Sequence, residues 1–92
     1  MQASRHPIAR LFDLLGRRWA LRVLWDLRDG PLRFKDLQAE EISTSVLTQR
    51  LADLAEAGVV ERAEDGRYAL TAKGDELKEL LLPLNDWARR NA

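Results

Sequence analysis

The hydrophobic period of the sequence changes at one place, between residues 59 and 70. Up to this place apolar residues recur three and four positions apart, which is the spacing of one helical face. Two short β-prone runs, Val59–Arg62 and Arg67–Leu70, then flank Asp65-Gly66. Asp-Gly favours a tight type I′ hairpin turn, in which both central residues have positive φ. The pattern predicts a single domain over residues 1–92, mainly α with a small β-hairpin (α+β).

Two helices are predicted before the hairpin region begins. Pro7 suits the first turn of a helix, and Gly16 is expected to end that helix in a left-handed conformation. Its apolar face comprises Ile8, Leu11, Phe12 and Leu15. A second, more buried helix is predicted from Arg17 to Asp29, stopped by Gly30-Pro31. Its apolar stripe comprises Trp19, Leu21, Val23, Leu24, Trp25 and Leu27.

A short helix and two longer ones complete the predicted order. Residues 32–39 are long enough for one or two helical turns. Ser43 is expected to cap the next helix, which Gly58 closes, and Thr71 to cap a final helix over about 72–91. Pro83 lies inside that last pattern, where we expect a kink rather than a break.

The short helix, the tight connection, the longer helix and the hairpin together are typical of a winged helix-turn-helix. The helix-turn-helix would span about residues 33–57 and the wing about 59–70. In this arrangement the second helix enters the major groove of DNA while the first braces it against the backbone. Order and spacing therefore favour a DNA-binding module.

The side chains of the second helix fit contact with DNA. Leu47, Leu51 and Leu54 would face inward, and the opposite face carries no acid before Asp53. Hydroxyls, amides and guanidiniums on such a face bind base edges or phosphates. The predicted DNA-binding residues are Arg33, Lys35, Thr44, Ser45, Thr48, Gln49, Arg50, Arg62 and Arg67. The alternative is that Ser43 and Thr44 only start a helix whose outer face is merely solvated.

The charge balance at first argues against a nucleic-acid partner. The chain has 15 Lys+Arg and 15 Asp+Glu, so its formal net charge is zero. Residues 1–50, however, carry nine Lys/Arg and six Asp/Glu, and residues 51–92 carry six and nine. The basic excess thus lies in the half that holds both helix-turn-helix helices. We expect modest non-specific DNA affinity with a steep dependence on salt.

Several other function classes lack the residues they need. Without cysteine, and with the single histidine His6, the chain has no thiolate nucleophile or multi-histidine metal site. We therefore predict that it is not an enzyme and holds neither metal nor cofactor. The N-terminal residues lack the apolar stretch of a secretory signal and no apolar run is long enough for a membrane span. The expected location is the cytoplasm.

A few residues leave two interpretations open. His6 suits a passive surface residue more readily than a functional side chain. Arg17-Arg18 suits either phosphate contact or a solvated helix start. Trp19, Trp25 and Trp87 suit core or interface packing more readily than a ligand pocket.

An ordered series of short segments carries a resemblance to a known family. The matching segments are Asp13–Trp19, Val23–Leu27, Gly30–Leu37, Ile42-Ser43, Val46–Leu51, Leu54, Ala57–Val60, Arg62, Tyr68, Leu70-Thr71, Lys73-Gly74 and Trp87. From His6 to Trp87 the chain resembles the HxlR-type winged helix-turn-helix transcriptional regulators. The resemblance implies a homodimeric bacterial regulator whose N- and C-terminal helices, about 7–16 and 72–91, build the dimer interface. The implied interface residues are Ile8, Leu11, Phe12, Leu77, Leu80, Leu81, Leu84 and Trp87.

Three departures from the family pattern bear on function. Many members have a cysteine before the proline that matches Pro7, where this chain has His6, so thiol sensing is expected to be absent. The connection between Leu37 and Ile42 is about two residues shorter and lacks the usual proline and glycine. The wing is also shorter and carries Glu64 and Asp65 near its tip, which suits minor-groove insertion poorly.

The sequence predicts a dimeric, sequence-specific regulator of transcription bound to double-stranded DNA. Each protomer would place the second helix in the major groove of one half-site, and a pseudo-palindromic operator would set the half-sites about 34–36 Å apart. A winged-helix module that binds protein without DNA affinity is the alternative, favoured by the zero net charge and the acidic wing. The sequence leaves open a small-molecule effector.

Overall fold

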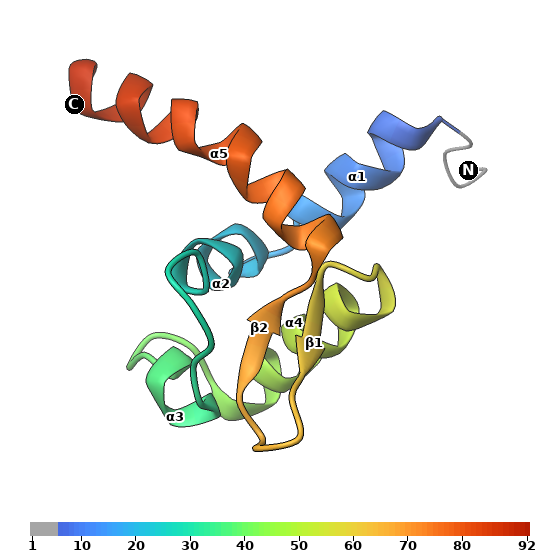
Figure 1. The fold of residues 1–92 in the computed structure, drawn as a ribbon. Helices are drawn as coiled ribbons and strands as arrows, with labels where there is room; N and C mark the ends of the chain where they lie inside the picture. Colours follow the sequence, from blue (N-terminus) through green and yellow to red (C-terminus); the bar gives the residue numbers. More distant parts are fainter. Residues whose placement is uncertain (1–5) are drawn as a thin grey trace.

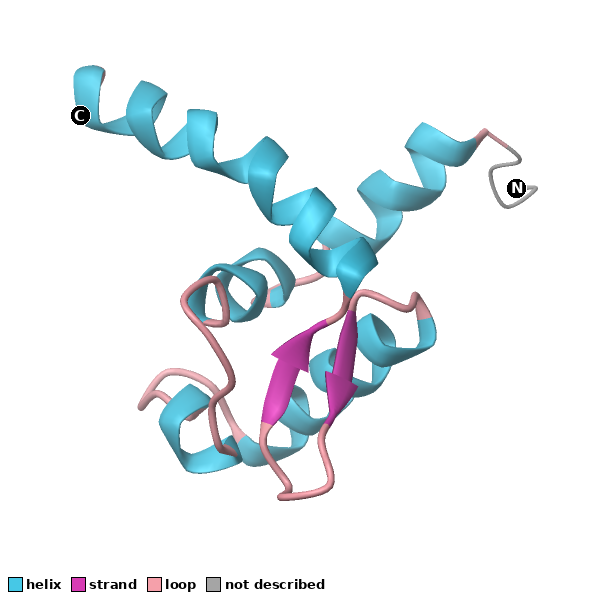
Figure 2. Ribbon diagram, in the orientation of Figure 1, coloured by secondary structure: helices cyan, strands magenta, loops and turns pink. Residues whose placement is uncertain are grey.

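The computed structural model describes residues 6–92 of the chain. The expectation that the N-terminal segment is not a secretory signal concerns mainly residues 1–5, which lie outside the described residues. The elements follow the order α1 (Pro7–Leu15), α2 (Ala20–Asp26), α3 (Phe34–Leu37), α4 (Thr44–Glu56), β1 (Val60–Arg62), β2 (Tyr68–Leu70) and α5 (Ala72–Arg90). The prediction of a mainly helical winged helix-turn-helix with one antiparallel hairpin is confirmed (Figure 2).

The core lies where α2, α4 and the first strand meet. Its buried side chains are Val23, Leu24, Leu27, Leu37, Ile42, Leu47, Leu51, Leu54, Val59 and Val60. Each such aliphatic side chain contributes about 1.5–3 kcal/mol on leaving water. The inward face predicted for α4, Leu47, Leu51 and Leu54, is confirmed by its full burial.

Local capping signals define the ends of α4 as predicted. The Ser43 hydroxyl accepts a hydrogen bond from the Val46 N–H at 3.2 Å. Gly58 follows the last turn with φ of 80°, a left-handed conformation that glycine adopts without strain. These two residues set the length of the helix before any tertiary contact is considered.

The predicted second helix is wrong in its start and its length. The structure begins α2 at Ala20 and ends it at Asp26, so the interval before it is a tight connection. The left-handed residue in that connection is Trp19, with φ of 76°, whereas Gly16 has φ of −78°. The partly buried Trp19 side chain packs against the core, and this packing offsets the backbone strain. Leu21, expected in the buried stripe, is an exposed residue.

The hairpin is confirmed in place but not in turn type. Val60, Glu61 and Arg62 pair with Leu70, Ala69 and Tyr68. In the turn, the Gly66 N–H donates to the Ala63 carbonyl at 2.9 Å, and Gly66 has φ of 88°. Asp65 does not have positive φ, so the turn is not type I′. The three-residue loop instead places a left-handed glycine after a tight turn.

Leu32 belongs to the wing rather than to the short helix predicted over 32–39. It forms an antiparallel bridge with Tyr68, through N–H···O hydrogen bonds of 2.9 and 2.7 Å. The helix α3 therefore starts only at Phe34. This bridge fastens the start of the helix-turn-helix to β2, which lies between Leu32 and β1.

The helix α5 joins the winged domain to a projecting arm. Thr71 caps it, accepting from the Gly74 N–H at 3.0 Å, and its hydroxyl donates to the Gly58 carbonyl at 2.6 Å. The helix runs through Pro83 without a break. Figure 1 shows α1 and the later part of α5 diverging from one end of the molecule. The hairpin turn and α3 lie at the other end.

Candidate DNA-binding surface

The outer face of α4 carries four exposed polar side chains. These are Thr44, Ser45, Thr48 and Gln49. The Thr48 hydroxyl donates to the Thr44 carbonyl at 2.9 Å, and the hydroxyl oxygens of Ser43 and Ser45 lie 3.3 Å apart. The structure thus brings the predicted base-contacting hydroxyls and amide together on one exposed face.

Arg50, predicted on the same surface, lies differently. Its side chain is 18% exposed, and its Nη1 lies 2.5 Å from Asp53 Oδ2. The guanidinium is turned toward the body of the protein because Asp53 and the connection before α2 lie on that side. To contact a base directly, the Arg50 side chain would have to break its ion pair with Asp53.

Asp53 gathers a small charged cluster at the flank of α4. Its Oδ2 also lies 3.0 Å from Nη1 of Arg17, and its Oδ1 accepts from Nε2 of Gln49 at 2.9 Å. The Gln49 hydrogen bond, aided by Arg17 and Arg50, holds the pKa of Asp53 below its ordinary value, although burial acts against this. For Arg17, phosphate contact and a solvated helix start were the two predicted roles. The ion pair with Asp53 is a third role that the sequence did not indicate. Arg18 instead stacks over the Trp19 ring at 5.1 Å.

Gln38 holds the connection between the two helices of the helix-turn-helix, a role that the sequence analysis missed. Its Nε2 donates to the carbonyl of Ile42 and, at 3.3 Å, to that of Ala39. Its Oε1 accepts from the Thr44 hydroxyl at 3.4 Å. The short connection without proline or glycine is therefore stabilised by one amide side chain. The signal in the sequence was a lone glutamine directly after the bracing helix.

The basic residues of the wing are held by acceptors within the wing. Nε of Arg67 donates to Asp65 Oδ2 at 2.8 Å, and the Arg67 backbone N–H donates to Oδ1 at 3.0 Å. These hydrogen bonds lower the pKa of Asp65. Arg62 donates to the Gly66 carbonyl at 3.3 Å and lies 5.4 Å from the centre of the Tyr68 ring.

Arg33 and Lys35 stand exposed at the start of α3. The Arg33 backbone N–H donates to Asp36 Oδ2 at 3.2 Å, and the Arg33 guanidinium helps to lower the pKa of Asp65. The Leu32–Tyr68 bridge lies beside Arg33 and Arg67 in the chain. The start of α3 and the wing therefore present their cations at one end of the molecule.

The opposite end exposes apolar side chains on the two projecting helices. Phe12 on α1 is 64% exposed, and Leu80, Leu84 and Trp87 on α5 are 69%, 60% and 59% exposed. Ile8 is exposed as well. Leu77 and Leu81, predicted in the same interface, are instead half-buried against the core of their own protomer. Leu11 is half-buried too.

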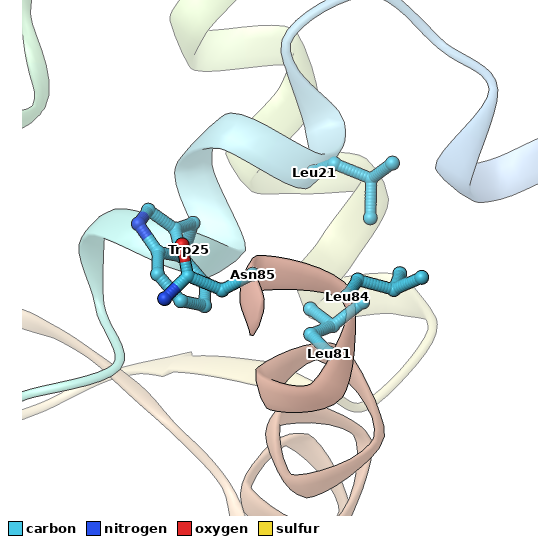
Figure 3. A pocket seen from close by; sticks show the side chains of 5 residues that line it. All are labelled: Leu21, Trp25, Leu81, Leu84 and Asn85. Carbon is cyan, nitrogen blue, oxygen red and sulfur yellow. The ribbon is translucent and has the colours of Figure 1, made fainter. Parts of the chain in front are cut away.

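An apolar groove of about 220 Å³ separates α2 from α5 (Figure 3). It is lined by Leu21, Trp25, Leu81, Leu84 and Asn85. Of the three tryptophans weighed as pocket residues, Trp25 lines this groove, with the Arg28 guanidinium 4.2 Å from the centre of its ring. Trp19 packs on the core, and Trp87 projects from α5. The three do not form one pocket.

Within residues 6–92, no helix combines the length and apolar character needed to cross a membrane. The same residues hold no cluster of three or more metal-ligating side chains.

A bracing helix, a tight connection, a second helix with an exposed polar face and a paired hairpin together define a winged helix-turn-helix protein. The family model described as HxlR-like helix-turn-helix matches residues 14–92. The chain belongs to this family, and it is a transcriptional regulator of the DNA-binding helix-turn-helix type.

Its relatives agree in both sequence and structure. The HTH-type transcriptional regulator YodB of Bacillus subtilis is 35% identical over 85 residues, covering 84% of this chain and 76% of the relative. The crystal structure of quinone-bound YodB has a TM-score of 0.82 and covers 92% of this chain and 98% of that one. A possible HxlR family factor from Thermoplasma volcanium is 30% identical, with a TM-score of 0.78, covering 91% and 83%.

Proposed function

We propose that this regulator binds DNA as a homodimer and that each protomer inserts α4 into the major groove. The observation that carries the proposal is the outer face of α4, where Thr44, Ser45, Thr48 and Gln49 are exposed together. Amide and hydroxyl groups read base edges in the major groove. An exposed helix face without carboxylates over its first two turns also suits the negative potential of DNA.

The basic residues at the same end would position the protein on the phosphate backbone. Arg33 and Lys35 lie on the bracing helix, and Arg62 and Arg67 flank the wing turn. Contacts to phosphate set orientation and most of the salt-dependent affinity, whereas base contacts set specificity. A pseudo-palindromic operator with half-sites about 34–36 Å apart follows from two-fold symmetry.

The dimer is supported by the exposed apolar residues on α1 and α5. A domain of this size buries a smaller share of its surface than a larger domain does, so covering Phe12, Leu80 and Leu84 with a second copy would stabilise it. Patches of this kind on a small protein mark interaction sites. A symmetric pairing would place two α4 helices on the same side of the assembly.

Regulation without a thiol is the third part of the proposal. The relative HypR is described as a redox regulator, and YodB has been solved in reduced, diamide-treated and quinone-bound forms. None of these 92 residues is a cysteine, which supports a signal other than cysteine oxidation or alkylation. A different stimulus would therefore control it.

The test combines selection of a binding site with a salt series. Duplexes selected from a random pool are titrated by fluorescence anisotropy from about 50 to about 200 mM salt. We expect binding that prefers the selected sequence and weakens steeply with salt. Ser45→Glu should abolish it by placing a carboxylate against phosphate, whereas Asn91→Glu adds the same charge at the far end of α5 and should not.

Two outcomes would overturn the proposal. Absence of any sequence-preferring binding, with a protein partner retained through purification, would instead support the winged-helix interaction module. A monomer by light scattering at every concentration would contradict the homodimer while leaving the α4 interface open to its own test.

A further inference from the structure

Asp53 joins α4 to the connection between α1 and α2 by an ion pair with Arg17. Its side chain is 10% exposed, and both carboxylate oxygens are in use. Oδ1 accepts from Gln49 at 2.9 Å, while Oδ2 meets Arg17 at 3.0 Å and Arg50 at 2.5 Å. A largely buried carboxylate with three partners on two segments is held in one position in this part of the fold.

The hydrogen bond from Gln49 restricts the side chain best suited to read adenine. A glutamine amide reads adenine through Nε2–H to N7 and Oε1 to the N6 amino group. The amide has two N–H groups, so one bound to Asp53 leaves the second and Oε1 for a base. Holding the amide in advance removes part of the entropy cost of ordering it at the interface.

The two arginines give the same carboxylate a second connection. Arg17 lies directly after the end of α1, in the connection that contains the left-handed Trp19. Arg50 is part-buried, and its Nε is buried without a hydrogen-bond partner among the described residues. The carboxylate therefore supplies the counter-charge that lets Arg50 stay inside and ties α4 to the base of the α1 arm.

We propose that Asp53 is a positioning residue that orients Gln49 for base recognition and links that orientation, through Arg17, to the connection following α1. This inference rests on the proposed function, since it assigns a specificity role within the α4 interface. It makes sequence preference depend on a residue that carries a negative charge and does not itself touch DNA.

The experiment measures the ratio of the dissociation constants for unrelated and selected duplexes, at one salt concentration. Asp53→Ala and Asp53→Asn are compared with the unaltered protein, and circular dichroism verifies that each is folded. Removing an acid near DNA strengthens binding to every sequence by electrostatics. We nevertheless expect the ratio for Asp53→Ala to fall about tenfold, the size of one lost bidentate base contact. Asp53→Asn keeps an acceptor for Gln49 but not the ion pairs, so its ratio should fall by less.

Glu56→Gln is the matched control, because it removes one negative charge three residues further along the same helix. It should strengthen binding to both duplexes and leave the ratio unchanged. A double-mutant cycle then isolates the pair: in a Gln49→Ala background, Asp53→Ala should change the ratio no further. The loss should also fall on the base pairs at which Gln49→Ala loses preference.

Failure of this inference is distinguishable from failure of the proposed function. If the unaltered protein prefers its selected sequence and Asp53→Ala keeps the full ratio, only the positioning role is overturned. An equal loss in the Gln49→Ala background would likewise overturn it, because the effect would then not pass through Gln49. If the unaltered protein shows no sequence preference, both proposals are overturned.

Discussion

The two ends of this molecule satisfy their side chains in opposite ways. At the wing and α4, polar groups are paired within the protomer: Asp65 holds Arg67, and Asp53 holds Gln49, Arg50 and Arg17. On α1 and α5, apolar groups such as Phe12 and Leu84 are mostly exposed. Polar groups that are hydrogen-bonded to one another can still bind a charged partner, because the water and ions on their surface exchange easily. Apolar groups lower the free energy only when they are buried.

The pairing of polar groups also bears on the formal net charge of zero. Some of the acids that balance the arginines at the wing and α4 are the groups that form ion pairs with them. A formal net charge of zero therefore includes charges that are paired inside the molecule.

Leu84→Asp, at the apolar end, should dissociate the proposed dimer. In the proposed dimer this change buries an unpaired carboxylate, which costs several kcal/mol, of order 2–7 kcal/mol for a polar group without partners. We expect a folded monomer by light scattering and at least a hundredfold weaker binding to a two-half-site duplex. Arg89→Asp, on the opposite side of α5, should stay dimeric. An unchanged dimer in the first variant would show that Leu84 lies outside the interface.

Gly74→Ala should disturb the junction between the two ends. A Cβ at this buried position would lie 2.1 Å from the Val59 carbonyl oxygen, which is backbone and cannot move aside cheaply. Overpacking of this kind costs about 1–3 kcal/mol. Chemical denaturation should give that loss in the free energy of unfolding. Glu76→Ala, two residues later on the exposed side, serves as the control and should change it little.

The charged cluster at Asp53 should make stability depend on pH. Its folded pKa is lowered, so it stabilises the fold above its ordinary pKa, and this contribution is lost as the pH falls below about 4. Denaturation midpoints for the unaltered protein and Asp53→Asn should therefore differ near neutral pH and converge in acid. A difference that stays constant down to pH of about 3 would contradict the assigned pairing.

Asp65→Asn, at the polar end, should have the smallest effect, a modest gain in affinity for DNA. It releases the Arg67 guanidinium and removes an acid from the wing tip. We expect binding to any duplex to strengthen by roughly two- to threefold, with a plot of log K against log salt steeper by up to about 0.9. Glu61→Gln removes the same charge away from Arg67 and separates the two causes. An unchanged salt slope would show that Arg67 does not reach phosphate.

Much of the fold was predictable because its signals are local. Ser43 and Thr71 cap their helices and Gly58 closes α4, all through groups within a few residues. The errors arose where a distant segment decided the outcome. The helix predicted from Arg17 begins three residues later, and Leu32 pairs with Tyr68 instead of entering the short helix.

The candidate site divides in the same way. Helical spacing was enough to place Thr44, Ser45, Thr48 and Gln49 on one exposed face, and their exposure follows from the burial of the leucines opposite. Spacing places Asp53 one turn after Arg50, but it could not predict that Arg17, from a segment more than thirty residues earlier, pairs with the same carboxylate and keeps the cluster against the body of the protein. Nor could it separate Leu80 and Leu84, which are exposed, from Leu77 and Leu81, which pack on the core.

Sequence alone is enough to predict the order of elements, the change from helical to strand spacing between residues 59 and 70, and the polar face of α4. These depend on backbone propensity and on the periodicity of neighbours along the chain. The tertiary structure was needed to establish the left-handed Trp19, the pairing of Leu32 with Tyr68 and the ion pair between Arg17 and Asp53. Those features are set by contacts between distant segments, whose energies are comparable with local preferences and therefore override them.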